Sequence, residues 1–367
     1  MLPVIDPPAP AVPVRRGALD LTAMELREWL EQRGQPALRA RQIRRWIVVM
    51  GAESFEQMTD LPKDLRQDLA AAFVPLASQV DLHQRAADDT HKLLLRLTDG
   101  RRIECVLIQE GSRRTACIST QVGCGMGCVF CASGLNGVER NLTTAEIVEQ
   151  LLRLRNLPPA SRERERPELP ARLTHIVVMG MGEPLANLDA LVEALDVATA
   201  KDGLGIGARH ITISTVGLPA KIRRLADLGK QYHLAVSLHA PSDALRSQIV
   251  ESNAKTGIAA ILDAANYFHE RTNRQVTFEY VLLRDINDDA THARELALLL
   301  RGQHAHVNVI PFNDVYGLPY RRPTQEALTE FTAVLEKHGV SVKVRKRKGS
   351  EIDAACGQLR RRVEQTQ

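Results

Sequence analysis

The spacing of hydrophobic residues divides the chain into a helical N-terminal part and a longer part in which strands and helices alternate. From Leu19 to about Phe73 the apolar residues recur at helical intervals. Thr22 precedes Glu25 by three residues, which is the spacing of a capping box at the start of a helix. Another helix is expected after Pro62.

The helix between these two has an apolar face and a basic surface. We expect its apolar residues near one face and its arginines on the others: Leu38, Ile43, Trp46 and Ile47 against Arg39, Arg41, Arg44 and Arg45. Such arginines are typical of a solvated helix face or of a phosphate-binding surface, and the pattern leaves both open. The region is therefore predicted to form a small helical module with one basic surface.

Between His91 and Gln109 the apolar period changes to two, and Asp99-Gly100 separates two such runs. This arrangement is a strong signal for a β-hairpin. The hairpin carries Glu104, and a glutamate on a hairpin is more often a solvated residue than a functional one. Cys105 is expected to be a small buried residue.

After the hairpin, strand and helix patterns alternate. The expected strands are Ala116–Thr120, His175–Met179, His210–Ser214, His233–Leu238, Val276–Leu283, His306–Ile310 and Ser341–Arg345. The expected helices are Thr144–Arg155, Leu188–Ala200, Pro219–Leu228, Ile258–Arg271, Asp289–Arg301 and Thr324–His338. Six strand-then-helix repeats predict parallel βα units of the α/β class, and because a closed barrel needs eight, an open partial (β/α)6 barrel fits best.

Glycine-rich and polar segments follow the expected strands, and parallel βα folds place their chemistry at the carboxyl ends of strands. These segments begin with Cys124 after the first strand and continue with Gly180–Pro184, Ser214–Gly217, Ser237–Pro241 and Pro311–Asn313. We therefore expect all of them around one mouth of the barrel.

Composition narrows the class of protein. A chain of 367 residues with 44% hydrophobic and 25% charged residues is ordinary for a globular protein and long enough for one large and one smaller domain. No run approaches the ~20 apolar residues of a membrane span, and the proline-rich residues 1–16 do not read as a secretory signal. The net charge of +4 is too small to imply nucleic acid by itself. Six cysteines in so long a chain indicate a reducing cytosol, so we expect a cytoplasmic protein.

Three cysteines, Cys124, Cys128 and Cys131, lie within eight residues. Thiolates are the usual ligands of iron–sulfur clusters, and a four-iron cubane with three protein ligands keeps one iron open for a substrate. Gly123, Gly125 and Gly127 suit a backbone that curls round an inorganic core, where Cβ atoms would crowd the sulfides. A structural zinc site is the alternative, but no histidine that would complete it occurs between Cys117 and Cys131 or just after. Three plain core cysteines are a further alternative.

The chain ends in basic residues around one more cysteine. Cys356 lies between Lys343–Lys348 and Arg360–Arg362, where it is well placed to meet a phosphate-bearing substrate. The polar segment Leu157–Arg172 reads as a mobile surface loop inserted between a helix and the next strand.

The Cys-x3-Cys-x2-Cys pattern resembles the signature of the radical S-adenosylmethionine (SAM) enzymes, in which SAM chelates the open iron and is cleaved to a 5′-deoxyadenosyl radical. The wider set of motifs resembles the RlmN/Cfr family of radical-SAM RNA methyltransferases, from about Leu19 to Leu359. These motifs are Gly123–Cys131, Arg140–Thr143, Gly180–Pro184, Ser237–Pro241 and Asp353–Leu359. The ending Ala-Cys-Gly-Gln-Leu, with Cys117 seven residues before Cys124, is the more specific part.

The resemblance implies methylation of carbon 2 of an adenine in 23S ribosomal RNA, with a transfer RNA adenine as a second substrate. Carbon 8 is the target of the Cfr branch. Carbon 2 is electron-poor and does not displace the methyl group of SAM, whereas a carbon radical adds to it. The departures after Cys131, at Ala132–Val138, leave the target carbon open, while Gly182-Glu183-Pro184 favours the RlmN branch.

By the same resemblance, Cys356 takes a methyl group from one SAM and a second SAM supplies the radical that removes hydrogen from it. The resulting methylene group links Cys356 to the adenine, Glu104 acts as the general base, and Cys117 resolves the adduct and leaves a disulfide. The implied cluster ligands are Cys124, Cys128 and Cys131, and the implied SAM contacts are Gly182, Glu183, Ser214, Ser237, Leu238, His239 and Asn313. From the residues alone, His239 as a core histidine and Asn313 as a turn former stay open.

We expect five regions: a disordered tail (1–18), a helical RNA-binding module (19–85), a hairpin linker (90–110), the radical-SAM partial barrel (111–346) and a basic C-terminal segment with Cys356 (347–367). The expected partners are ribosomal RNA, transfer RNA and an electron donor such as flavodoxin, with no membrane, and the expected state is a monomer. Two other functions compete, a radical-SAM enzyme acting on a polypeptide or small molecule, and a non-catalytic RNA-binding protein with a structural metal.

Overall fold

The computed structural model describes residues 15–158 and 171–359. Most of the predicted disordered tail and of the polar insertion, and the final basic block Arg360–Arg362, lie outside these residues. No helix in the described part of the chain has both the length and the apolar composition needed to cross a bilayer.

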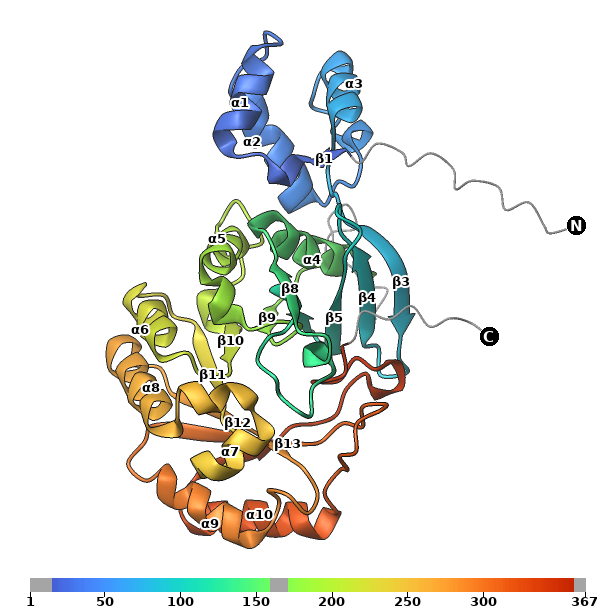
Figure 1. Cartoon of the computed structure of the whole chain (residues 1–367). Coiled ribbons are helices and arrows are strands. Elements are labelled where there is room, and N and C mark those ends of the chain that lie inside the picture. Colours follow the sequence, from blue (N-terminus) through green and yellow to red (C-terminus); the bar gives the residue numbers. More distant parts are fainter. Residues whose placement is uncertain (1–14, 159–170, 360–367) are drawn as a thin grey trace, which may run out of the picture.

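The N-terminal module contains three α-helices within its described residues, and Figure 1 shows it beyond one end of the main sheet. The helices are α1 (Ala23–Glu31), α2 (Leu38–Arg45) and α3 (Lys63–Ala72). A short parallel pair, β1 (Arg16–Gly17) with β2 (Phe73–Val74), joins the two ends of the module. The predicted capping box is confirmed, because Glu25 N donates to Thr22 Oγ1 at 3.1 Å and Thr22 N donates to Glu25 Oε2 at 2.7 Å.

Helix α2 differs in part from the predicted arrangement. Ile43 and Ile47 are buried as expected, but Leu38 is 52% exposed, so its assignment to the apolar face was wrong. Leu38 is the first residue of α2, where no earlier turn of this helix covers it. Arg39 donates to Gln42 and to the carbonyl oxygen of Asp60, so this arginine holds a neighbouring loop.

Ten strands of the described chain form one sheet in the order β14-β13-β12-β11-β10-β9-β6-β5-β4-β3. From β14 to β6 the neighbours run parallel, and from β6 to β3 they run antiparallel. The strands are β3 (Gln79–Arg85), β4 (His91–Arg96), β5 (Arg102–Glu110), β6 (Arg113–Cys117), β9 (His175–Val178), β10 (Ile211–Thr215), β11 (His233–Ser237), β12 (Val276–Leu282), β13 (Ala305–Pro311) and β14 (Ser341–Val344).

The predicted hairpin is confirmed as β4 and β5, with Gly100 at a φ of 81° in its turn. Strand β3 lies within the range 19–85 but pairs with β4 in the main sheet. The first parallel strand, β6, ends at Cys117 rather than at Thr120. A separate two-stranded sheet of β7 (Gln121–Gly123) and β8 (Val138–Asn141), which the sequence analysis did not predict, brackets the cysteine loop.

The helices between the parallel strands match the prediction, apart from one that it lacked. They are α4 (Thr144–Asn156), α5 (Leu188–Thr199), α6 (Pro219–Asp227), α7 (Asp243–Ile249), α8 (Ile258–Thr272), α9 (Ala290–Leu299) and α10 (Gln325–Lys337), of which α7 is the additional one. Figure 1 shows α5, α6, α8, α9 and α10 along the outer side of the curved sheet. The predicted α/β partial barrel is therefore confirmed.

Strand register shows which side chains share one face of the sheet. Residues that are directly paired across neighbouring strands point to the same side. Cys117 of β6 pairs with Val106 of β5 and with Val177 of β9. Val177 pairs with Thr212, two residues before Ser214 on β10. Continuing across the sheet, Ser214 pairs with Ala235, and Ser237 pairs with Glu279, which pairs with Asn308. Cys117, Ser214 and Ser237 therefore project from one face.

Candidate active site

A cavity of about 150 Å³ lies at the carboxyl ends of the parallel strands. It brings together every candidate residue of the sequence analysis except Glu104, Cys117 and Leu238. Those that line it are Cys124, Cys128, Cys131, Gly182, Glu183, Ser214, Ser237, His239, Asn313 and Cys356. Leu238 is fully buried, and its main-chain nitrogen donates to the carbonyl oxygen of Glu279.

The cysteine loop is fixed by its own backbone and by the segment that follows α7. Cys124 N donates to Gly137 O at 3.0 Å, and Val129 N donates to Ile249 O at 3.0 Å. Gly123 and Gly127 have φ values of 82° and 66°, which glycine adopts at little cost. A Cβ at Gly123 would collide with the Gly137 carbonyl, and one at Gly127 with the Glu251 carboxylate, so the protein itself also requires glycine at these two positions.

The three cysteines of the loop fit the protein ligands of an iron–sulfur cluster. Burial raises the pKa of Cys124 to about 12 and the pKa of Cys128 well above its usual range, and the positive charge of a bound metal would offset that cost of ionisation. Within the described residues, no three histidine, cysteine or acidic side chains converge closely enough to hold one ion. Three thiols of one loop that line the cavity are the ligand set of a four-iron cluster with one open iron.

Arg246 of α7, which the sequence analysis missed, forms hydrogen bonds with the residues at the ends of β10 and β11. It is 1% exposed and donates to the carbonyl oxygens of Leu238, Ser237 and Val216 at 3.0, 3.0 and 2.6 Å. Burial lowers its pKa to about 10, which leaves it charged at neutral pH. A single arginine in a short segment gives no periodic pattern, and only the fold brings these carbonyls to it.

Glu183 organises the loop after β9. Its carboxylate accepts hydrogen bonds from Leu185 N, Thr215 Oγ1 and Val216 N at 3.0, 2.7 and 2.8 Å. Burial raises its pKa, and these donors act in the opposite direction. A carboxylate has about four acceptor positions, so one remains for an amino group entering the cavity.

His239 presents one defined face to the cavity. Its Nδ1 accepts a hydrogen bond from Val281 N at 3.1 Å, which places the ring proton on Nε2. Burial, together with Arg246, lowers its pKa to about 3, so the ring is neutral. The imidazole packs edge-on against Phe130 of the cysteine loop, with ring centroids 4.8 Å apart. Nε2–H is therefore a donor available to a ligand.

The C-terminal segment is fastened to the rim of the cavity by several hydrogen bonds. Asn313 Nδ2 donates to Cys356 O at 3.2 Å, Ala132 N donates to Gly357 O at 2.7 Å, and Gln358 Nε2 donates to Asp314 O at 2.8 Å. These contacts hold Cys356 beside the cysteine loop.

Cys117, Cys356 and Arg345 lie close enough to one another for their charges to interact. Burial, then Cys356, raises the pKa of Cys117 to about 12, and Arg345 acts to lower it. The pKa of Arg345 is raised chiefly by Cys356, and its guanidinium lies 3.9 Å from the Glu279 carboxylate. Both thiols are free in this structure, so their disulfide stays a prediction.

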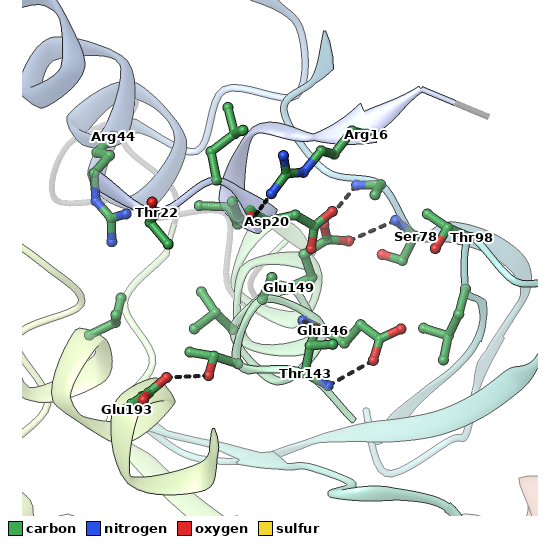
Figure 2. A pocket seen from close by; sticks show the side chains of 18 residues that line it. Arg16, Asp20, Thr22, Arg44, Ser78, Thr98, Thr143, Glu146, Glu149 and Glu193 are labelled. Carbon is green, nitrogen blue, oxygen red and sulfur yellow. Dashed lines mark hydrogen bonds between the residues drawn. The ribbon is translucent and has the colours of Figure 1, made fainter. Parts of the chain in front are cut away.

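A larger cavity of about 690 Å³ lies between the N-terminal module and the sheet, away from the cysteines. Figure 2 shows Arg16, Asp20 and Arg44 facing Glu146 and Glu149 of α4 across it. The Glu149 carboxylate accepts hydrogen bonds from Ala77 N and Ser78 N, both at 2.7 Å. Its carboxylates already have partners in the chain, so this cavity serves as the junction between module and sheet rather than as a reaction centre.

Comparison with known proteins agrees with this geometry. A model of the radical SAM superfamily matches residues 118–297, and a model of the ribosomal RNA large subunit methyltransferase N-terminal domain matches residues 18–74. A solved structure, described as a radical SAM methyltransferase from Sphaerobacter thermophilus, superposes with a TM-score of 0.87 at 43% identity, covering 95% of this chain and 100% of that one.

Two curated relatives match nearly the whole chain. A protein of Rhodopirellula baltica named "Probable dual-specificity RNA methyltransferase RlmN" is 53% identical over 349 residues, which are 95% of this chain and 92% of that protein. A protein of Opitutus terrae with the name "Probable dual-specificity RNA methyltransferase RlmN 3" is 48% identical and covers 91% of each chain. The chain therefore belongs to the RlmN family of radical-SAM RNA methyltransferases.

Proposed function

We propose that this protein methylates carbon 2 of an adenine in 23S ribosomal RNA, and an adenine of transfer RNA, through a methylated Cys356. The observation that carries the proposal is the position of Cys356, which lines the same cavity as the three loop cysteines and lies in electrostatic reach of Cys117. A thiol that passes on a methyl group needs the radical source on one side and a second thiol on the other.

Cys124, Cys128 and Cys131 would hold three irons of a [4Fe–4S] cluster. Gly182, Glu183, Ser214, Ser237, Leu238, His239 and Asn313 would hold SAM, with Glu183 accepting from its amino group and His239 Nε2 donating. When bound, the cluster and SAM supply an electron, a 5′-deoxyadenosyl radical and the methyl group. Two SAM molecules are used per turnover, one as methyl donor and one as radical source.

The side chains then have separate tasks. The thiolate of Cys356 accepts the methyl group, and the Arg345 guanidinium, whose pKa is raised chiefly by Cys356, lies close enough for the two groups to interact. Glu104 takes the proton from carbon 2 of the adenine that has become linked to Cys356. The thiolate of Cys117 attacks the sulfur of Cys356, and the bond between that sulfur and the methylene carbon breaks with its electron pair staying on the adenine side. The methylene carbon takes up a proton to become the methyl group, and the two cysteines are left as a disulfide.

The N-terminal module is proposed to contact RNA phosphates. Arg41 and Arg45 of α2 are exposed, which suits such contacts. We further propose that the protein is a cytoplasmic monomer and that an electron donor such as flavodoxin would reduce its cluster. A Cfr-like reaction at carbon 8 is the second candidate, because the residues after Cys131 depart from the usual RlmN pattern.

The test combines two measurements. Anaerobic reconstitution with iron and sulfide, followed by SAM and dithionite, is expected to yield 5′-deoxyadenosine, and its absence would leave only an RNA-binding role. Mass spectrometry of ribosomal and transfer RNA nucleosides from the host with and without the gene then identifies the product. The proposal requires 2-methyladenosine to disappear with the gene, whereas loss of 8-methyladenosine would favour the second candidate.

A further inference from the structure

Lys92 of β4 forms an ion pair with Glu104 inside the protein. Its Nζ lies 3.2 Å from Glu104 Oε1, and the two side chains are only 9% and 3% exposed. Burying a carboxylate costs free energy unless an opposite charge and hydrogen bonds compensate it. Because moving away from Lys92 would lose that compensation, the pair holds the Glu104 side chain in one orientation.

Strand register places this pair on the same face of the sheet as Cys117. Lys92 pairs with Val106, and Val106 pairs with Cys117, while Glu104 pairs with Leu94. Adjacent strands are about 4.8 Å apart, so Lys92 and Cys117 are about 10 Å apart across the sheet. Glu104 lies on the strand between them, on the side where β6 ends and where Ser119 Oγ donates to Glu104 O at 2.6 Å.

Lys92 also touches the segment that carries Cys356. Its Nζ donates to Asp353 O at 3.4 Å, and an ammonium group has three donors, so one lysine serves both partners. The same segment binds the β3–β4 turn, where Gly349 N donates to Asp88 and Ala87 N donates to Glu351. In Figure 1 this C-terminal segment passes beside one end of β3 and β4.

We propose that Lys92 is a positioning residue of the reaction: it fixes the Glu104 carboxylate relative to Cys356, at the place where the adenine proton must be taken. The inference rests on the proposed function, since it assigns Lys92 to the proton-transfer step of that reaction. In this role Lys92 orients the Glu104 side chain and makes or breaks no covalent bond.

The proposal separates the steps of the reaction. The contacts of Asn313, Gly349 and Gln358 remain when Lys92 is replaced, so Cys356 stays in place and accepts its methyl group. The linked adenine then keeps its proton, because Glu104 has lost the partner that orients it. The covalent protein–RNA species should therefore accumulate.

The position of Lys92 can be tested in the reconstituted full-length protein with two variants, Lys92→Met and Lys92→Arg. Lys230→Met is the control, because it removes an exposed lysine that pairs with Asp196. In Lys92→Met, methylated Cys356 measured by mass spectrometry should stay within about twofold of wild type. Released methyladenine should fall at least tenfold, with a shifted protein–RNA band on a denaturing gel. Lys92→Arg should recover product to within about threefold, and Lys230→Met should match wild type.

Release of methyladenine by Lys92→Met at the wild-type rate would overturn the proposal. So would parallel loss of methylated Cys356 and product with no shifted band, because Lys92 would then only hold the fold.

A second measurement needs neither cofactor nor RNA, so it decides about the pair even if wild type methylates no adenine. Thermal unfolding of the cluster-free protein is compared for Lys92→Met, Glu104→Gln and the double variant. Lys92→Met should lower the melting temperature, and adding Glu104→Gln should restore most of that loss because the buried negative charge that Lys92 compensated is gone. Additive losses would contradict the pairing on which the proposal depends.

Discussion

The side-chain amide of Asn313 donates a hydrogen bond of 3.2 Å to the main-chain carbonyl oxygen of Cys356. Asn313 follows the end of β13, and Cys356 lies in the C-terminal segment, so this bond joins a barrel loop to the residue proposed to carry the methyl group. Asn313 also lines the cavity that we assign to SAM.

Replacing Asn313 by alanine should slow methylation of Cys356. One hydrogen bond contributes about 1 kcal/mol, so the rate should fall roughly fivefold while the melting temperature changes little. Mass spectrometry of the Cys356 peptide after single turnover measures this rate. Gln275→Ala removes a similar amide-to-carbonyl bond, to Ala305, at an exposed position and should have no effect. An unchanged rate in Asn313→Ala would show that the bond does not position Cys356.

The two thiols of the proposed relay should give opposite results on substitution. Cys356→Ala should abolish methylation of RNA, since no sulfur accepts the methyl group. Cys117→Ala should trap a covalent protein–RNA species, visible on a denaturing gel, because nothing attacks the Cys356 sulfur. Cys105→Ala is the matched control, as Cys105 is fully buried and faces away from this surface of the sheet. Turnover by Cys356→Ala, or a clean gel with Cys117→Ala, would contradict the relay.

Arg246 should contribute to stability far more than a surface arginine. Arg246→Met leaves the buried carbonyl oxygens of Val216, Ser237 and Leu238 without this donor. We expect the free energy of unfolding to fall by about 3–5 kcal/mol, because each unsatisfied group costs about 1–3 kcal/mol. Chemical denaturation measures it, with Arg224→Met, which breaks the exposed pair with Asp189, expected within about 1 kcal/mol of wild type. Equal losses in both variants would refute the assignment.

His175 should make the protein less stable in weak acid. Burial, Arg113 and the stacked His210 lower its pKa from 6.5 to about 4. Between these two values the unfolded chain binds more protons than the folded one, so stability falls as pH drops from 6.5 towards 4 and is unaffected above 6.5. In His175→Asn the free energy of unfolding should fall less steeply with decreasing pH, and the change in slope should correspond to less than one bound proton. Denaturation curves taken at several pH values measure this slope. An unchanged slope in His175→Asn would contradict the lowered pKa of His175.

Local patterns were sufficient to predict most of the architecture. The capping box at Thr22, the Asp99-Gly100 hairpin and the alternating strands and helices all depend on residues close in sequence, and the structure contains each of them. The cysteine loop and the glycines after β9 were found in the same way, because each motif lies within a few residues.

Contacts between distant segments were not predictable from one sequence. Lys92 looked like any strand residue until register and the C-terminal segment brought Glu104 and Asp353 to its amino group. The period of two did place Lys92 on one face of the predicted hairpin. A lysine within an apolar run indicates a buried charge, which needs an acidic partner elsewhere in the fold. Arg246 gave no such signal, since its acceptors come from two other strand ends.

The most direct test of the whole account uses SAM whose methyl group carries three deuterium atoms, in a single anaerobic reaction with RNA. If the methyl group passes through Cys356 and loses one hydrogen atom there, the methyladenine should carry two deuterium atoms and the 5′-deoxyadenosine one. A methyladenine that retained all three, with unlabelled 5′-deoxyadenosine, would mean direct transfer from SAM and would contradict the account.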